Sequence, residues 1–242
     1  MISFFENHAL LSRTGQHEWF TVNGGSVQYV DRLNKELVNR NVELRLGDPI
    51  KEVRRGPFGV QILSQKSEID FFDHVVFATH SDDTLKMLAD PSKGEATALG
   101  AIKYQPNQAV LHHDQNVMPK NRNCWASWVY TEDKKTSRNP IGLTYWMNSL
   151  QPIPESDPMF VTLNSKNKID PYKIYDEATF MHPVYDLPAL NAQKDLAENN
   201  GKKNTWFCGA WMKNGFHEDG LASAIDVVAK FSDKISVKIA AQ

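Results

Sequence analysis

Several patterns that would assign a function directly are absent from this chain of 242 residues. None of its 13 glycines forms G-x-G-x-x-G, the motif that seats a dinucleotide pyrophosphate on a helix N-terminus. There is no G-x-S-x-G around a nucleophilic serine, and no H-E-x-x-H or C-x-x-C spacing for a metal. A serine hydrolase and a zinc site are therefore poorly supported, and we expect no metal ligands.

Excess charge, long apolar runs and cysteines are also scarce. The 27 basic and 29 acidic residues nearly balance and the lysines are scattered, so nucleic acid is not an expected partner. No apolar run approaches the ~18–20 residues that span a bilayer, and the first residues lack the basic start of a signal peptide. Cys124 and Cys208 lie far apart in the sequence, and neither belongs to a catalytic motif. Two cysteines without a disulfide framework are typical of a reducing compartment. These features predict a globular cytoplasmic protein without a transmembrane segment.

The residues before position 50 predict an extended segment, a helix and a strand. Residues 19–22 are aromatic or β-branched, and a Gly-Gly turn follows them. Ser26 is placed to cap a helix whose apolar residues recur at steps of three and four, at Val27, Val30, Leu33 and Leu37. The alternation of apolar and polar residues in 42–46 predicts a half-buried strand.

Short strands dominate the next segment. Residues 50–55 and 59–64 are separated by a Gly-Pro turn and predict a hairpin. Within 74–80 the residues from Val75 to Ala78 are continuously apolar, which predicts a strand covered on both faces. Ser81 would then cap a helix with two acids in its first turn.

Residues 104–181 change character. Strand-like pieces rich in Trp and Tyr alternate with turns that contain Pro and Asp, which predicts an antiparallel, aromatic-lined sheet. A helix at 188–201, an apolar strand at 205–210 and a final helix follow. The fold class is therefore α/β with mixed α+β character.

Three potentially reactive side chains are consecutive at His217-Glu218-Asp219. Ligands on one helical face need a spacing of three or four, so these side chains point in different directions and cannot share a metal. A helix start instead offers N–H groups without intrahelical partners, which stabilise phosphate or a carbonyl that gains negative charge. Gly220 would let a ligand approach the backbone, and the helix would bury a stripe of Leu221, Ile225, Val228 and Phe231. A helix start that simply packs on protein remains the alternative.

A resemblance to a known family favours the ligand-binding interpretation. The segments GGSVQYVDRLNKEL, DPIKEV, FDHVVFATHSDDTLKML and FCGAW…GFHEDGLASA follow in the order seen in the flavin-dependent amine oxidase superfamily, which includes protoporphyrinogen oxidases and phytoene desaturases. TYWMNSLQ, LHHD…MP and TWFCGAW…GFHEDGL are similar to a bacterial branch of FAD/NAD-binding amine-oxidase-like proteins. The resemblance covers essentially the whole chain. It implies a partial Rossmann-type FAD domain and an antiparallel β-rich substrate domain.

The resemblance also implies how the chain is divided. Residues 1–16 would be a remnant of the substrate domain, 17–90 the middle segment of the FAD-binding domain, 91–199 the substrate domain and 200–242 the C-terminal FAD-binding segment. The family's G-x-G-x-x-G unit is missing, so we expect a fragment with an incomplete FAD site. The missing N-terminal FAD-binding segment is then an expected partner.

Two parts of the implied FAD site lie in the strand-rich region before residue 80. The strand from Ile50 to Val53 resembles the one whose backbone meets the FAD adenine. Ala78 and Thr79 resemble the chain that passes the phosphate and ribose of the cofactor. Both assignments rest on the resemblance.

Two further parts of the implied site lie near the C-terminus. Gly209 and Ala210 fall where the family has its second acidic FAD motif, and Ala210 replaces the acid. Asp219, Gly220 and Leu221 resemble the helix start whose N–H groups face the flavin N1–C2=O edge. This edge becomes anionic on reduction, so the helix dipole would stabilise reduced flavin.

The aromatic segment is the candidate substrate wall, although aromatic residues on strands also form ordinary cores. The wall would comprise Tyr145, Trp146 and Asn148 with Trp125 and Trp128, and Trp211 and Phe216 beside the helix start. The family has no universal nucleophile because flavin N5 takes the hydride. The catalytic base therefore stays unassigned, with His217 the candidate nearest the motif.

Two functions are compatible with these features. The first is the C-terminal part of an FAD-dependent oxidoreductase that transfers a hydride from a small hydrophobic substrate to flavin. The second is a non-catalytic binding module without flavin, on the scaffold that GDP-dissociation inhibitors share. The missing G-x-G-x-x-G and Ala210 favour the second function, and the ordered motifs with HEDGL favour the first.

Overall fold

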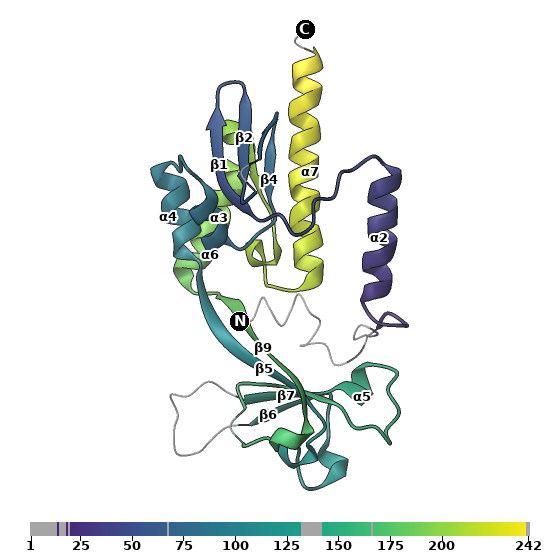
Figure 1. The fold of residues 1–242 in the computed structure, drawn as a ribbon. Coiled ribbons are helices and arrows are strands. Elements are labelled where there is room, and N and C mark those ends of the chain that lie inside the picture. The colour runs from purple at the N-terminus through teal and green to yellow at the C-terminus, as the bar shows by residue number, and fades with distance from the viewer. Residues whose placement is uncertain are drawn as a thin grey trace. The chain divides into compact units, whose positions relative to one another are not determined.

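The computed structural model describes residues 14, 18, 20–66, 68–131, 142–165 and 167–240, with residues 233–240 as backbone only (Figure 1). Apart from Thr14, the expected remnant 1–16 lies outside these residues, and so does Trp19. The chain divides into two compact units. Unit 1 comprises Met1–Leu44 with Pro106–His182, and unit 2 comprises Arg45–Gln105 with Pro183–Gln242.

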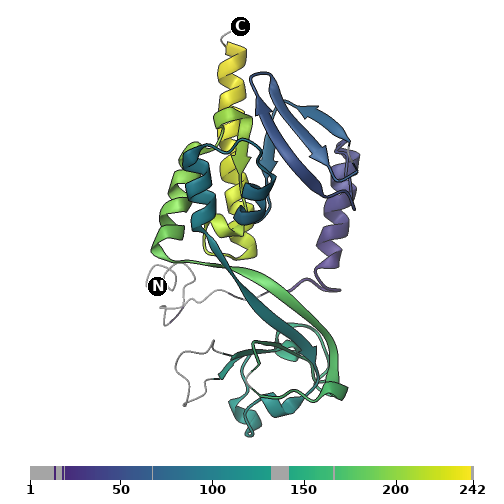
Figure 2. The same cartoon turned by 60° about the vertical axis from the view of Figure 1, so that its left-hand side comes forward.

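A five-stranded sheet in the order β6-β7-β8-β5-β9 forms the body of unit 1. Its strands are β5 (Lys103–His112), β6 (Trp128–Thr131), β7 (Gly142–Trp146), β8 (Phe160–Leu163) and β9 (Ile174–Val184), with the short helix α5 (Met147–Leu150) after β7. The pairs β6 with β7, β7 with β8 and β5 with β8 are antiparallel. Strands β5 and β9 run side by side and each crosses a unit boundary (Figures 1 and 2). The expected antiparallel, aromatic-rich region is confirmed.

One face of this sheet holds a buried polar chain. The Nδ1 atom of His112 accepts the backbone N–H of Asp114 at 3.0 Å, so Nε2 carries the ring proton. Nε2 then donates to Thr162 Oγ1 at 2.8 Å, and Thr162 bonds Thr144 at 3.0 Å. The ring of His112 stacks on Phe160. Burial lowers the pKa of His112, which keeps the imidazole neutral.

Unit 1 also contains the helix expected after the Gly-Gly turn. Helix α2 (Val27–Asn39) begins after Ser26, although the serine side chain makes no capping hydrogen bond. The apolar residues expected to pack are exposed or half-exposed, and α2 has no buried residue. The periodicity therefore predicted the helix correctly, but its apolar face is not covered by described residues.

Two small sheets and four helices form unit 2. Strands β1 (Ile50–Gly56), β2 (Gly59–Ser64) and β3 (Ile69–Phe72) are antiparallel, and β4 (Val75–Phe77) pairs in parallel with β10 (Thr205–Phe207). The helices are α3 (Ser81–Met87), α4 (Lys93–Ala101), α6 (Leu187–Asn199) and α7 (His217–Ala240). Three-residue 3₁₀ helices occur in both units, at η1 (Gln115–Val117), η2 (Arg122–Cys124), η3 (Pro171–Lys173), η4 (Lys202–Asn204) and η5 (Ala210–Met212). Helices α4 and α6 lie side by side (Figures 1 and 2).

Strand β10 lies at the centre of unit 2. One core, which includes Phe207, joins the β-sheet residues to Leu99 of α4 and Leu196 of α6. A second core on the other side packs Trp206 against Val227 and Phe231 of α7. All three residues of β10 are buried, as expected of a strand covered on both faces.

A buried ion pair ties β1 to α4. The Arg55 guanidinium donates to both carboxylate oxygens of Glu95, at 2.6 and 3.0 Å, and also bonds Asp90. Glu95 completes a capping box with Ser92 at the start of α4. Burial alone would raise the pKa of Glu95, but the hydrogen bonds from Arg55 and Ser92 lower it to about 2.

Three local expectations are corrected. Residues 42–46 form no strand, and Leu46 is 84% exposed, because no neighbouring strand pairs with them among the described residues. Ser81 does not cap α3; His80 occupies that position, and the buried Ser81 hydroxyl accepts a hydrogen bond from Tyr104. Strand β4 is buried on one face only, since Val76 is 51% exposed.

The expected buried stripe of α7 is also corrected. Leu221, Ile225 and Val228 are each more than half exposed, and only Phe231 of this set packs against Trp206. The residues that face β10 are instead Val227 and Ala224. Helix α7 thus carries a second apolar stripe that no described residue covers.

The compact units divide the chain at residues other than the expected domain boundaries. Helix α2 belongs to unit 1, whereas α4 and α6 belong to unit 2. The reason for α6 is its packing, because Ala189, Ala192 and Leu196 lie in the same core as Leu99 of α4. That the units correspond to FAD-binding and substrate domains stays a prediction.

Candidate functional site

The carboxyl ends of β4 and β10 form one edge of unit 2. Because β4 and β10 are parallel, the segments that follow them leave the sheet at the same edge, and open α/β sheets bind ligands at this edge. The backbone N–H of Cys208 donates to Phe77 O, and the indole N–H of Trp211 donates to Thr79 O at 2.9 Å. Ala78 and Gly209, two predicted cofactor contacts, therefore lie on neighbouring segments, just after β4 and β10.

Gly209 is required by the fold of this edge. Its φ of +144° disfavours a side chain, and a Cβ atom there would lie 2.7 Å from the indole nitrogen of Trp211. Its N–H donates to the Ser223 hydroxyl at 2.9 Å, and this hydroxyl donates to Gly220 O at 2.7 Å. Ser223 thus ties the end of β10 to the first turns of α7.

Gly220, in contrast, is not required by its described neighbours. A Cβ atom there would make only ordinary contacts, at 3.7 and 3.9 Å from atoms of Ala210. Glycine inside a helix costs about 1 kcal/mol relative to alanine. The free space and the cost together suit a ligand that approaches the backbone at this point.

The helix start lies three residues earlier than the motif suggested. Helix α7 begins at His217, and the N–H of Gly220 donates to Phe216 O within the first turn. The Asp219 carboxylate accepts the N–H of Phe216 at 3.0 Å, which caps the helix. Asp219, Gly220 and Leu221 therefore lie in the first and second turns, and the first-turn N–H groups precede Gly220.

These residues fit one part of FAD. A helix N-terminus beside a helical glycine suits the electron-rich edge of a flavin ring. Ala210, at the end of β10, offers no carboxylate for a ribityl or phosphate contact. The sequence also contains no G-x-G-x-x-G cradle for the pyrophosphate. The chain's own residues thus suit the flavin side of the cofactor better than its phosphate side.

The two residues predicted to meet the adenine lie on β1. Val53 is buried in the core of unit 2, and its carbonyl accepts the N–H of Ala89. Ile50 is partly exposed at the start of the strand. Of these two residues, Ile50 is therefore the one open to a ligand, and the adenine contact stays a prediction.

Two tyrosines near the start of α7, Tyr104 and Tyr185, were not predicted from the sequence. The Tyr104 hydroxyl accepts the N–H of Ser81 at 2.8 Å, and its ring stacks on His80. Burial, with the charge of Asp219 and the neighbouring Tyr104, raises the pKa of Tyr185 to about 12. Both hydroxyls stay protonated at neutral pH. Neither residue belongs to a motif, so the sequence offered no signal for them.

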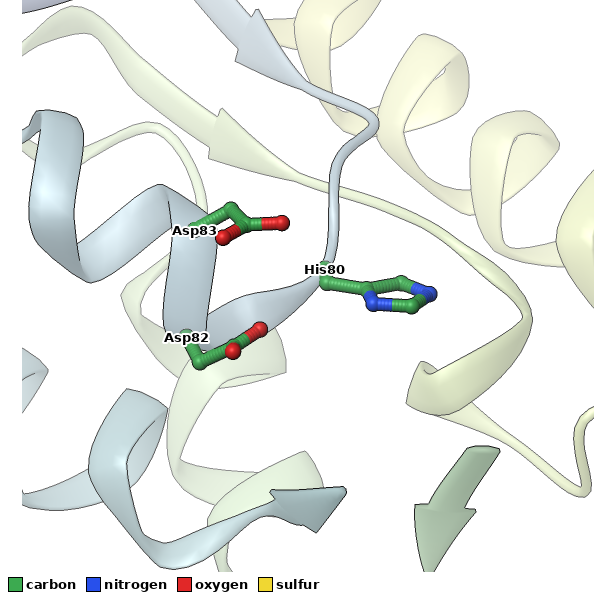
Figure 3. Close-up of side chains that lie close together, drawn as sticks. All are labelled: His80, Asp82 and Asp83. Carbon is green, nitrogen blue, oxygen red and sulfur yellow. The ribbon is translucent and has the colours of Figure 1, made fainter. Parts of the chain in front are cut away.

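One group of side chains has the composition of a metal site. The ligand atoms of His80, Asp82 and Asp83 lie within 4.8 Å of one another at the start of α3 (Figure 3). Lys86 donates to Asp83 at 2.8 Å and contacts Asp82 at 3.5 Å, and its hydrogen bond to Asp83 is the main cause of its raised pKa. The ammonium group therefore already compensates part of the charge of these two carboxylates, and we assign no metal.

The predicted substrate wall is divided between the two faces of the unit 1 sheet. Tyr145 and Trp146 are consecutive on β7, so their side chains point to opposite faces. Trp146 packs in the buried core against Trp125, with which it makes an edge-to-face contact. Tyr145 is opposite Trp128 on the other face, and both line a pocket of about 840 Å³.

The remaining predicted wall residues have different environments. The Asn148 side chain is used within its own loop, as an acceptor from Met159 N and a donor to backbone carbonyls. Trp211 is 3% exposed in the core of unit 2, so it is a core residue here. Phe216 is 45% exposed at the start of α7, beside His217. The roles of Phe216 and His217 stay predictions.

Comparison with known protein families decides the membership of this chain. The family model described as flavin containing amine oxidoreductase matches residues 1–159, about two thirds of the chain. The chain belongs to this family. The expected resemblance and the mixed α/β class are thereby confirmed, and members of the family are FAD-linked oxidoreductases. No curated protein matches the chain by sequence.

Solved structures of the same fold are similar to this family member at low sequence identity. Cyclohexylamine oxidase from Brevibacterium oxydans IH-35A has a TM-score of 0.59 and 11% identity, over 88% of this chain and 53% of that one. A CLA-producing fatty acid isomerase from P. acnes has a TM-score of 0.57 and 16% identity, over 81% and 50%. A redesigned putrescine oxidase has a TM-score of 0.54 and 11% identity, over 86% and 53%. The chain therefore spans about half the length of each of these structures.

A membrane-crossing helix, long and apolar enough to span a bilayer, does not occur in the described part of this family member. Both cysteines are free, Cys124 at the surface and Cys208 in the core. Burial raises the pKa of the Cys208 thiol, which therefore stays protonated.

Proposed function

We propose that this chain forms part of an FAD-dependent oxidoreductase that transfers a hydride from a small hydrophobic substrate to flavin. The proposal rests chiefly on the edge of unit 2 where the ends of β4 and β10 meet the start of α7, in a member of a flavin oxidoreductase family. FAD, when bound, supplies the hydride acceptor. The free cysteines agree with a reducing, cytoplasmic compartment.

The chain's own contribution to this chemistry is orientation and charge stabilisation. The start of α7 would place its dipole and first-turn N–H groups at the flavin edge that gains negative charge. Gly220 would let that edge approach the backbone, and the Ser223 bridge would fix the helix against β10. No described side chain is assigned as a catalytic base.

We further propose that a segment outside these 242 residues completes the FAD site. The lack of G-x-G-x-x-G in the sequence supports this, as does the span of about half the related structures. The exposed stripe of Leu221, Ile225 and Val228, with Val76 on β4, supports it too. Exposed apolar side chains on a helix and on a two-stranded parallel sheet suit coverage by further helices and strands.

The test is isolation of the protein from its native source under mild conditions. We expect flavin absorbance in the visible range and release of FAD on denaturation. We also expect G-x-G-x-x-G either in a longer form of the same native polypeptide or in a second polypeptide that co-purifies with it. A native protein that releases no flavin would overturn the oxidoreductase proposal. Flavin bound to the 242 residues alone would overturn only the proposal of a completing segment.

The alternative is a non-catalytic binding module on the same scaffold, without flavin. The alanine at 210, in place of an acid, favours it. Under this alternative, saturating FAD leaves the melting temperature of the native protein unchanged. A ligand that binds only the folded state raises it, so the measurement separates the two functions.

A further inference from the structure

The pocket on the open face of the unit 1 sheet has an aromatic and apolar lining. Trp128 of β6 and Tyr145 of β7 are directly opposite each other and form one wall. Phe20, Met147 and Leu150 add apolar surface around them. With a volume of about 840 Å³, the pocket is large enough for a molecule of several rings or an extended chain.

The polar residues that the structure describes in this pocket are all uncharged. Among the described residues, no Asp, Glu, Lys, Arg or His lines it. The Ser149 hydroxyl is already used, since it donates to Trp146 O at 2.8 Å. The Tyr145 hydroxyl has no hydrogen-bond partner in the described part of the chain. Burial raises the pKa of Tyr145, so this hydroxyl remains a donor at neutral pH.

The rim of the pocket is held in place by Asn148. Its amide nitrogen donates to the carbonyls of Pro154 and Asp157, both at 2.7 Å, and its amide oxygen accepts Met159 N–H at 2.8 Å. These bonds fix the loop that begins with the lining residue Gln151. The Gln151 side of the pocket is therefore ordered before a ligand enters, which reduces the entropy cost of binding.

A charged ligand would lose part of its hydration here and meet no counter-charge among the described lining residues, which is costly. We propose that this pocket binds an uncharged molecule whose apolar body lies on Trp128 and Tyr145 and whose carbonyl or hydroxyl oxygen accepts a hydrogen bond from Tyr145. Only one part of this inference rests on the proposed function, namely that the bound molecule is the substrate of the oxidoreductase. It narrows the substrate class to neutral compounds, as opposed to ammonium ions and carboxylates.

Three probes of nearly equal shape test the charge preference. Isothermal titration calorimetry at pH 7 compares 2-naphthalenemethanol, 2-naphthylmethylamine as its ammonium ion and 2-naphthoate, each with the purified chain. We expect the alcohol to bind at least about tenfold more tightly than either ion. An ion that binds as tightly as the alcohol would overturn the proposed class, and binding of none of the three would overturn the pocket.

Variants locate the binding. Trp128→Ala should weaken alcohol binding about tenfold, whereas Tyr130→Ala, two residues along the same strand and exposed, should leave it unchanged. Tyr145→Phe keeps the ring and should weaken the alcohol several-fold without affecting naphthalene itself. Unchanged alcohol binding in either Trp128→Ala or Tyr145→Phe would show that the alcohol binds elsewhere. No step depends on flavin, so failure here leaves the FAD proposal untouched, and a protein without flavin leaves this pocket testable.

Discussion

Replacement of Gly220 by alanine should stabilise the free protein and weaken its hold on flavin. Gly220 lies inside α7, where alanine is favoured over glycine by about 1 kcal/mol. The added Cβ would meet Ala210 only at 3.7 and 3.9 Å, so no steric cost offsets this gain. For a chain of this length, about 1 kcal/mol corresponds to a rise in Tm of about 2–4 °C.

Thermal melts by circular dichroism without FAD measure the first effect. Gly209→Ala is the matched control, since its φ of +144° and the 2.7 Å approach to Trp211 should lower Tm. A lower Tm for Gly220→Ala would refute the reasoning, because the glycine would then be a requirement of the fold.

FAD titration of the native protein measures the second effect. Gly220→Ala should lower FAD affinity and Gly220→Leu should lower it further, because the side chain fills the approach to the helix backbone. His217→Ala should leave the bound flavin in place, since we assign the contact to backbone groups. Equal flavin retention in Gly220→Leu and His217→Ala would contradict a close approach of flavin to this turn.

Four further predictions concern three buried side chains and one loop. Arg55→Met leaves the buried Glu95 carboxylate without its partner and should cost about 3–5 kcal/mol in urea denaturation, and a loss below about 1 kcal/mol would contradict this. Because the folded pKa of Glu95 is about 2 and its ordinary value is 4.5, the stability it contributes should vanish as pH falls from about 4.5 to about 2, measured as the pH dependence of Tm. Burial lowers the pKa of His112 from its ordinary 6.5, so unit 1 should lose stability as pH falls below about 6.5, and a slope that persists in His112→Asn would contradict this. Asn148→Ala should expose residues 151–158 to limited proteolysis, and an unchanged cleavage pattern would show that the loop does not need the amide.

The sequence predicted most elements whose signals are local. The hairpin of β1 and β2 follows from two short alternating runs around a Gly-Pro turn, and α6 follows from Pro188 near its start. The strands of the unit 1 sheet are predicted by their β-branched and aromatic residues. These elements depend mainly on neighbours in sequence.

Expectations failed where a segment's surroundings decide the outcome. The alternation in 42–46 is that of a strand, yet a strand needs a partner, and none lies beside it among the described residues. The apolar positions of α7 predicted a helix correctly but not which side is buried, because Val227 and Ala224 face β10 instead of Leu221 and Ile225. A periodic pattern identifies apolar positions, whereas the arrangement of other elements selects those that are covered.

The residues of the candidate site could be predicted only in part from the sequence, for a similar reason. The order of the motifs indicated both Gly209 and Gly220. Only the three-dimensional structure shows that the backbone requires glycine at 209, whereas the neighbours of residue 220 would accept a side chain. Tyr145 and Trp146 are adjacent letters of one aromatic motif, and the strand sends them to different faces. Tyr104 and Tyr185 approach the helix start from distant parts of the chain, so no local pattern could indicate them.

The Ser223 hydroxyl accepts from Gly209 N–H and donates to Gly220 O. A side chain at 223 must therefore perform both tasks within a buried space, which only a small hydroxyl-bearing residue can do. Threonine should serve almost as well as serine, while alanine and valine should each leave the Gly209 N–H without its partner. The set of amino acids that position 223 tolerates in a saturation library should thus be the narrowest in α7.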